Sequence, residues 1–199
     1  MENGLELALA RRAARIENLK EKIASLPARN FDGKITFEIG CGKGHYLSAY
    51  GAAHKNELCV GIDLISSRIR DGERKNEKLG NSNVYFIKAQ SGEFLEAMPR
   101  EVKFGKVFIF FPDPWPKKRH HKNRLIQPEF LDALKDCLAN GAKLFFRTDH
   151  SEYFDWAKSV FESHSDWEIL DGEELEFEEV SQFQRILPNF RTLCAVLKA

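Results

Sequence analysis

A strand that leads directly into a glycine-rich loop constrains this chain more than any other feature. The apolar run Lys34–Ile39 predicts the strand, Gly40, Gly42 and Gly44 follow at every second position, and residues 45–53 have helical composition. This order begins a doubly wound α/β sheet, because the glycines let the backbone approach a ligand and the helix N-terminus offers free N–H groups. We therefore expect a phosphate- or nucleoside-binding loop here.

The spacing of the glycines separates two kinds of nucleotide site. A dinucleotide fingerprint has the form Gly-x-Gly-x-x-Gly, but here the third glycine is Gly44, and His45 stands where that fingerprint has glycine. An acid, Glu38, precedes the loop. This form is similar to the first motif of adenosylmethionine-dependent methyltransferases, which implies that Glu38 and the three glycines contact S-adenosyl-L-methionine.

The next two predicted strands end in groups that suit a nucleoside. Leu58–Asp63 ends in a carboxylate 19 residues after Gly44. Asp63 could accept hydrogen bonds from both ribose hydroxyls of an adenosine, or it could be an exposed residue that begins a turn. The run Val84–Ile87 predicts the third strand. Gln90, three residues beyond it, either lies near the adenine of the nucleoside or is a polar residue without a role in binding.

Strands and helices continue to alternate to the C-terminus. The further strands are expected at Val107–Phe111, Ala142–Arg147, Trp167–Leu170 and Thr192–Leu197. The helices are expected at Ser66–Leu79, Phe94–Met98, Gln127–Leu138 and Ser151–Ser163. Ser66 or Ser67 should cap the first of these helices and Gly80 should end it, and Asn140-Gly141 should end the third. This pattern predicts an α/β fold with a seven-stranded, mostly parallel sheet and helices on both faces. Ligands of such sheets bind outside the carboxyl ends of the strands, so the acids at positions 38, 63, 113 and 149 should ring one crevice.

The loop after Val107–Phe111 combines an acid, an aromatic ring and positive charge. Prolines at positions 112, 114 and 116 restrict the backbone, so we expect an extended loop that presents Asp113 and Trp115. A basic block, Lys117–Arg124, follows. Such a combination suits a planar base attached to phosphates; the alternative is a stiff loop followed by a solvated charge run.

The overall charge limits the kind of nucleic-acid binding. Lys+Arg and Asp+Glu both total 30, which argues against a protein that coats nucleic acid indiscriminately and leaves room for a local patch. Six acids within residues 171–179 would repel RNA, so we expect this stretch on another face or shielding part of the site. The four cysteines are scattered without metal-ligand spacing, which predicts reduced thiols and no metal. No apolar run reaches membrane-spanning length, so we expect a cytoplasmic protein.

The N-terminal region is expected to be a helical extension, residues 1–30, before a main domain of residues 31–199. Residues Leu5–Leu26 have helical composition, and Pro27 ends the helix. This helix either packs as a cap against the domain or also contacts RNA backbone through Arg11, Arg12 or Arg15.

With both motifs in view, the chain resembles the tRNA (guanine-N7-)-methyltransferase family, in its single-chain bacterial form. The most specific part of the resemblance is the run from Phe111 to Arg124, followed by Gln127 and by Thr148-Asp149. The resemblance implies a Rossmann-like class I methyltransferase that moves a methyl group from S-adenosyl-L-methionine to N7 of a guanine in the variable loop of tRNA.

The resemblance also implies roles for individual residues. Cofactor contacts fall on Glu38, Gly40, Gly42, Gly44, Asp63, Gln90 and Asp113, and substrate contacts on Lys117, Arg119, Lys122, Arg124, Asp149, Ser181 and Gln184. Asp113 is also the implied catalytic residue. Two positions depart from the family, which has acids where this chain has Gln90 and Gln184, and the glycine that follows the C-terminal motif is absent around Ile186.

The chemistry of guanine N7 agrees with this reading. N7 is an exposed lone pair that bears no proton, so the reaction needs no general base. The enzyme must align the reacting atoms and exclude water. Asp113 could stabilise positive charge that grows on the purine, or it could accept a hydrogen bond from guanine N1 or the amino group. Trp115 either stacks on the base or braces the loop.

Three other functions remain open from the sequence. Gln90 and Gln184 would also fit an RNA-binding protein that has lost catalysis. The Asp113-Pro114-Trp115 order loosely resembles the loop of amino-group methyltransferases, although those have adjacent prolines, and a nicotinamide dehydrogenase is a more distant alternative. For the favoured reading the expected partner is tRNA, with no membrane, no obligate protein partner, and a monomer or homodimer.

Overall fold

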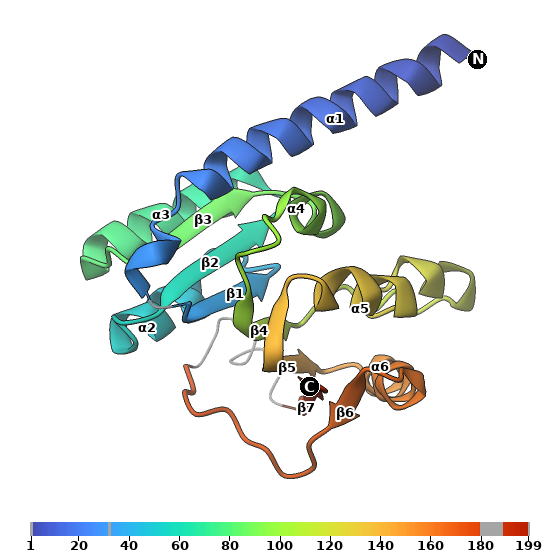
Figure 1. The fold of residues 1–199 in the computed structure, drawn as a ribbon. Helices are drawn as coiled ribbons and strands as arrows, with labels where there is room; N and C mark the ends of the chain where they lie inside the picture. The colour runs from blue at the N-terminus through green and yellow to red at the C-terminus, as the bar shows by residue number, and fades with distance from the viewer. Residues whose placement is uncertain (1, 32, 180–188, 199) are drawn as a thin grey trace.

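The computed structural model describes residues 2–31, 33–179 and 189–198 as a seven-stranded sheet with helices on both faces, as predicted (Figure 1). The strands are β1 Ile35–Ile39, β2 Leu58–Asp63, β3 Val84–Lys88, β4 Phe104–Phe110, β5 Leu138–Thr148, β6 Trp167–Ile169 and β7 Arg191–Leu197. The helices are α1 Glu2–Ala24, α2 His45–Ala53, α3 Ser66–Leu79, α4 Ser91–Ala97, α5 Pro128–Lys135 and α6 Ser151–Ser163, with short 3₁₀ helices at Ala28–Phe31 and Lys118–Asn123.

The strand order, β3-β2-β1-β4-β5-β7-β6, creates the crevice in which ligands of such sheets bind. All paired strands run parallel except β7, which is antiparallel to both β5 and β6. The chain winds outward from β1 to β3 and then crosses back to β4 on the other side of β1. The carboxyl ends of β1 and β4 therefore flank a topological switch point.

Two apolar cores fill the space on either side of the sheet. One packs α1, α4, α5 and α6 against the sheet, with Phe37 stacked between Phe94 and Phe104. The other packs α2 and α3 around Tyr46 and Phe108, and the segment after β6 adds to it. Every residue of β1 and β2 is buried, as in central parallel strands, and the polar exceptions to their apolar sequences are Thr36, Glu38 and Asp63.

The N-terminal helix α1 is packed over only part of its length. Its C-terminal half buries Ile16, Leu19 and Ile23 in the first core. Its N-terminal half projects beyond the rest of the molecule (Figure 1), and Leu5 and Leu9 are 65% and 58% exposed. The prediction that this helix packs against the domain therefore holds for its C-terminal half.

Two ion pairs fasten α1 to α4. Arg12 pairs with Glu96, and the Arg15 guanidinium spans both carboxylate oxygens of Glu93, with Nε 2.9 Å from Oε2. These pairs raise the pKa of both arginines and lower the pKa of both glutamates, mainly through the hydrogen bonds. Two of the three arginines considered as RNA contacts are thus already paired with carboxylates.

The predicted boundaries of the fifth helix and strand are wrong. Helix α5 ends at Lys135, and β5 begins at Leu138, which pairs with Phe104 of β4. Gly141 has a φ of 73° and lies inside β5, where the pairing register with β4 shifts. The glycine that sequence reading assigned to the end of a helix thus belongs to an irregularity of a strand, because pairing with β4 overrides the local helical pattern.

The start of α3 also differs from the prediction, whereas its end agrees. Ile65 precedes the helix, and no side chain caps it; instead, Asp63 Oδ1 accepts a hydrogen bond from the Ile65 backbone at 2.8 Å. Neither Ser66 nor Ser67 is the cap. Gly80 ends the helix in the left-handed conformation, as expected.

Candidate active site

The glycine loop between β1 and α2 leaves open space beside its backbone. Gly40, Gly42 and Gly44 have φ values of 75°, 55° and 65°, a region in which side chains are disfavoured. A Cβ added at Gly40 or Gly42 would meet no atom within 4 Å, whereas at Gly44 it would lie 2.5 Å from Cζ of Phe86. The first two glycines thus leave room for a ligand, and the third allows close packing of α2 on the sheet.

Asp63 joins this loop to the end of β2. Its Oδ2 accepts a hydrogen bond from the Gly42 backbone at 3.1 Å, and Arg68 Nη1 lies 3.5 Å from the same oxygen. The residue is only 7% exposed. Each carboxylate oxygen has more than one acceptor site, so Asp63 retains capacity for ribose hydroxyls while it holds the loop. It is not the exposed turn residue of the alternative reading.

Glu38 is a buried carboxyl group one residue before the end of β1. Burial raises the pKa of Glu38 to about 8, a hydrogen bond from the Leu47 backbone lowers it, and the nearby charge of Asp63 raises it. Its Oε2 has no hydrogen-bond partner among the described residues. Since buried polar atoms are normally paired, this oxygen has a free acceptor site next to the glycine loop.

Gln90 has a structural role that sequence reading did not foresee. Its side-chain oxygen accepts a hydrogen bond from the Glu93 backbone at 2.8 Å and caps the N-terminus of α4. The cap explains why α4 begins at Ser91 rather than at Phe94. An amide supplies the capping oxygen as a carboxylate would and also carries N–H donors, so the departure from an acid keeps this local structure.

The ends of β4 and β5 bring Asp113 and Asp149 to the same edge of the sheet. Phe110 pairs with Arg147 across the two strands, and the Phe111 backbone donates a hydrogen bond to the Arg147 carbonyl at 2.7 Å. Asp113 and Asp149 follow within three residues, and both are exposed. Together with the positions of Glu38 and Asp63, this places all four acids at the carboxyl edge of four adjacent strands.

The proline loop is folded rather than extended. Phe111 and Trp115 have φ values of 51° and 45°, which non-glycine residues seldom adopt. The ring of the half-buried Trp115 packs edge-on against His120 at 5.8 Å. The backbone therefore leaves the extended conformation on both sides of Asp113, and Trp115 braces the loop while part of the indole stays exposed.

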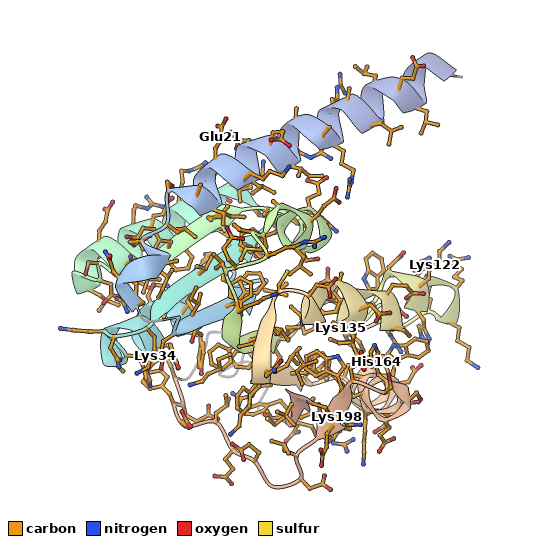
Figure 2. All side chains as sticks on the ribbon, in the orientation of Figure 1. Glu21, Lys34, Lys122, Lys135, His164 and Lys198 are labelled. Atoms are coloured by element: carbon orange, nitrogen blue, oxygen red, sulfur yellow. The ribbon has the colours of Figure 1, made fainter. Side chains whose placement is uncertain are left out.

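Three cations of the basic block point into solvent beside this loop. Lys117, Arg119 and Lys122 are exposed, and Lys118–Asn123 form the 3₁₀ helix. Figure 2 shows Lys122 at the outer end of this segment, on the side of the molecule opposite Lys34. Their exposure is compatible with the predicted RNA contacts, which stay a prediction.

Arg124 departs from the prediction for this block. Its side chain is 0% exposed, its Nε donates a hydrogen bond to the Pro114 carbonyl at 2.9 Å, and its guanidinium lies over the rings of Tyr153 and Trp156. In this position it cannot reach a phosphate in solvent. It faces inward because α6 offers aromatic faces that stack well on a guanidinium.

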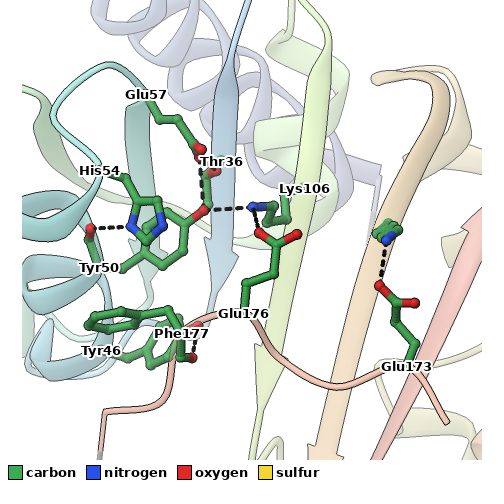
Figure 3. Close-up of polar contacts among 10 residues, drawn as sticks. Thr36, Tyr46, Tyr50, His54, Glu57, Lys106, Glu173, Glu176 and Phe177 are labelled. Carbon is green, nitrogen blue, oxygen red and sulfur yellow. Dashed lines mark hydrogen bonds and ion pairs between the residues drawn. The ribbon is translucent and has the colours of Figure 1, made fainter.

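The acidic stretch, residues 171–179, lies across the face of β4 and β5. Glu173 pairs with Lys143, Glu176 with Lys106 at 3.2 Å, and Glu178 with Arg147 (Figure 3 shows the first two pairs). The stretch packs Leu175 and Phe177 on the second core, and three of its six acids pair with cations of β4 and β5.

A buried polar network anchors this stretch to α2 and β1. Lys106 Nζ donates to the Tyr50 hydroxyl at 2.8 Å, and Tyr50 in turn donates to Glu57 at 2.9 Å (Figure 3). Thr36 bonds the same carboxylate. Phe177 packs against Tyr46 and accepts its hydroxyl hydrogen bond at the backbone carbonyl, 3.2 Å away.

Two predicted substrate residues, Ser181 and Gln184, lie outside the described residues. Helix α6 is capped by His150, which follows Asp149 and whose Nδ1 accepts a hydrogen bond from the Tyr153 backbone at 3.2 Å. In the part of the chain that the structure covers, no helix combines the length and apolarity needed to cross a membrane. The four cysteines are free and buried.

Among the residues that the structure describes, one cluster could formally ligate a metal, and it lies away from this edge. Asp132, His164 and Asp166 approach one another at the other ends of α5 and α6. Lys135 Nζ already lies 3.0 Å from Asp132 and 2.6 Å from Asp166. The ammonium group of Lys135 thus already pairs with both carboxylates.

The sheet order and the glycine loop at its switch point define a class I methyltransferase, and solved structures agree. A 16S rRNA methyltransferase, KamB, superposes with a TM-score of 0.62 at 16% identity, covering 94% of both chains. A precorrin-6y C5,15-methyltransferase from Geobacter metallireducens gives 0.59 at 14% identity, covering 92% of this chain and 86% of its own. The chain belongs to the family described as "Putative methyltransferase", whose model matches residues 32–198.

Relatives in sequence confirm the resemblance inferred from the motifs. The chain is 35% identical over 139 residues to a tRNA (guanine-N(7)-)-methyltransferase of Magnetococcus marinus, covering 66% of this chain and 52% of that protein. A protein of the same name from Prochlorococcus marinus is 28% identical over 177 residues, covering 86% of this chain and 85% of its own. A third, from Nitrosococcus oceani, is 35% identical over 144 residues, covering 72% and 61%. The chain thus spans about half to most of the length of these relatives.

Proposed function

We propose that this protein transfers a methyl group from S-adenosyl-L-methionine to N7 of a guanine in the variable loop of tRNA. The observation that carries the proposal is the meeting of two features at one edge of the sheet. The glycine loop with Asp63 is a nucleoside-type cradle, and the loop with Asp113 and the exposed Lys117, Arg119 and Lys122 adjoins it. The names of the sequence relatives support the same activity.

The residues present fit the cofactor. Gly40 and Gly42 leave a backbone cradle, Asp63 has spare acceptor sites for ribose hydroxyls, and Glu38 has an unpaired buried oxygen. Gln90 would offer its N–H donors to the adenine edge. When bound, S-adenosyl-L-methionine supplies an electrophilic methyl group on a sulfonium.

The protein's contribution to the reaction is alignment and charge. Guanine N7 carries no proton at neutral pH, so no residue has to remove one. Asp113, presented by the folded loop, would hold the base by accepting a hydrogen bond from its N1 or amino group, or stabilise the positive charge that develops on the purine. The exposed part of Trp115 would stack on the base.

The exposed basic group would bind the RNA backbone. Lys117, Arg119 and Lys122 would contact phosphates, which gives affinity and register with little base selection. Asp149, at the same sheet edge as Asp113, would contact the substrate base, and Ser181 and Gln184 complete the proposed substrate set. Arg124 is left out of this set, because its buried guanidinium faces the protein.

The proposal includes the setting in which the enzyme works. Residues 1–30 form an extension to the methyltransferase domain of residues 31–199. The protein acts on tRNA in the cytoplasm without an obligate protein partner, as a monomer or homodimer.

The test is incubation of the purified protein with labelled S-adenosyl-L-methionine and an unmodified tRNA transcript, followed by digestion to nucleosides and chromatography. Label in 7-methylguanosine is the expected result, and transcripts with single guanine substitutions in the variable loop would locate it. Label in an adenine-derived nucleoside would instead favour an amino-group methyltransferase. If the protein binds tRNA but a calorimetric titration with S-adenosyl-L-methionine gives no heat, an RNA-binding protein that has lost catalysis is favoured. Binding of NADH would favour a dehydrogenase.

A further inference from the structure

The buried guanidinium of Arg124 is the central contact between the Asp113 loop and helix α6. Its Nε lies 2.9 Å from the Pro114 carbonyl oxygen, and its Cζ lies 5.1 Å from the Tyr153 ring centre and 5.4 Å from that of Trp156. Nη2 lies 3.5 Å from Glu152 Oε1, close enough for an ion pair. Three residues of α6 and one carbonyl of the loop thus surround a single cation.

The residues that follow Arg124 are fixed to the same face of α6. The Ile126 backbone donates a hydrogen bond to the Tyr153 hydroxyl at 3.2 Å, and its carbonyl accepts one from Trp156 Nε1 at 3.0 Å. Ile126 is fully buried. The backbone next to Arg124 is therefore held in place by α6 and the core. This fixes the position from which the Arg124 side chain reaches the loop.

The loop carbonyl that Arg124 holds lies between the two side chains proposed to meet the base. Pro114 separates Asp113 from Trp115, and Trp115 has a left-handed backbone with a φ of 45°. Such a conformation is unfavourable for a residue with a side chain and persists only where the surroundings determine it. Pro114, whose carbonyl accepts the hydrogen bond from Arg124, directly precedes this strained residue.

We infer that Arg124 is a positioning residue for methyl transfer: through the Pro114 carbonyl it sets where Asp113 and Trp115 stand relative to the bound base. The inference rests on the proposed function. Arginine suits the task because its flat guanidinium stacks between rings and still directs an N–H along a fixed line, which a lysine ammonium does not do. The role differs from that of the neighbouring Lys122, which is exposed to solvent.

Two substitutions and a matched control test the inference. Arg124→Met keeps an apolar stem of similar length and removes the hydrogen bond, and Arg124→Lys keeps the charge. The control is Arg191→Met, because Arg191 of β7 also stacks on an α6 ring, that of Phe154, and pairs with an α6 acid, Asp155, whereas of the two arginines only Arg124 donates to the Pro114 carbonyl. The measurements are kcat and KM for both substrates, the salt dependence of tRNA binding, and hydrogen exchange of the amides in residues 111–117.

A positioning role predicts a specific pattern. Arg124→Met should lower kcat by about 10- to 100-fold, the size expected for a small misplacement of reacting groups, with KM for the cofactor within about twofold. Amides of residues 111–117 should exchange faster, the slope of tRNA affinity against salt should stay unchanged, and Arg124→Lys should recover part of kcat. Arg191→Met should leave kcat and the exchange of the loop as in the wild type.

Other results would overturn the inference. A weaker tRNA affinity with a shallower salt slope and unchanged kcat would make Arg124 a phosphate contact. Equal losses in the Arg124→Met and Arg191→Met proteins would make its role one of general stability. If the wild-type protein methylates no tRNA, the proposed function fails. Hydrogen exchange still reports whether Arg124 fixes the loop, and unchanged exchange of residues 111–117 in Arg124→Met would by itself refute the contact with Arg124 as the cause of the loop's position.

Discussion

Glu178 and Arg147 form a two-point ion pair at the carboxyl edge of the sheet, with Nη2–Oε1 and Nη1–Oε2 distances of 2.6 and 3.1 Å. Arg147 is 3% exposed, and its guanidinium also lies over the rings of Phe110 and Phe190. Phe110 is the last residue of β4, directly before the loop that carries Asp113. The pair therefore fastens the acidic stretch to the same strand ends that present the candidate catalytic residue.

Removal of this pair should destabilise the protein. Glu178→Gln leaves the buried Arg147 with neutral partners only, the new amide and the Thr192 hydroxyl. We expect the free energy of unfolding to fall by about 1–3 kcal/mol, the range for a polar group deprived of its partner. The measurement is urea unfolding of the variant and the wild type at equal ionic strength. Glu174→Gln is the matched control, because Glu174 is an exposed acid of the same stretch; equal stability of the two variants would show that the pair contributes nothing.

Asp113 should be required for turnover and not for folding. The residue is exposed in a loop, so Asp113→Ala should unfold at the same urea concentration as the wild type while kcat falls by at least about 100-fold, a size typical for one preorganised group that stabilises charge. Near-normal turnover by the folded variant would remove Asp113 from the catalytic role.

Asp113→Asn separates the two roles proposed for this side chain. The amide keeps an oxygen that accepts a hydrogen bond and loses the negative charge. Activity well above that of Asp113→Ala would indicate that the residue mainly positions the base. Activity as low as that of Asp113→Ala would indicate that the charge itself is required.

The exposed basic group should account for much of the salt dependence of tRNA binding. Replacing Lys117, Arg119 and Lys122 by alanine should weaken tRNA binding and reduce the slope of log affinity against log salt by roughly 2–3, or about 0.7–0.9 for each phosphate that the protein no longer neutralises. The control carries the same charge change at the opposite edge, at the exposed Lys34, Lys55 and Lys78. If both triple variants bind tRNA with the same slope, the RNA-binding surface lies elsewhere.

The buried carboxyl of Glu38 should make stability fall as pH rises. Burial raises its pKa in the folded protein from 4.5 to about 8, so between these values the folded state holds a proton that the unfolded state has released. Its contribution is complete below pH 4.5 and is lost as pH rises through about 8, at up to about 1.4 kcal/mol per pH unit. Urea unfolding from pH 5 to 8 should show a steeper decline in the wild type than in Glu38→Gln; parallel curves would contradict the raised pKa.

Much of the fold follows from local features of the sequence. Central parallel strands are buried on both faces, so their apolar runs are visible without the structure, and the positive φ of Gly40, Gly42 and Gly44 is a local requirement that only glycine meets easily. The element order then leaves few arrangements for the sheet. The positions of Glu38 and Asp63 at the strand ends follow from the same reasoning.

The tertiary structure decided between roles that the sequence does not distinguish for neighbouring residues of the same type. Lys122 and Arg124 stand two residues apart in one basic block, yet one is exposed and the other is buried against α6, because the aromatic rings that receive it come from about 30 residues further along the chain. Gly141 lies in β5 because pairing with β4 outweighs its local preference. The sequence by itself determined the central strands β1 and β2, the glycine loop and the acids at the strand ends, since these depend on short-range sterics and burial. Which charges face solvent and which hold the loop depended on interactions between distant segments, which only the folded chain brings together.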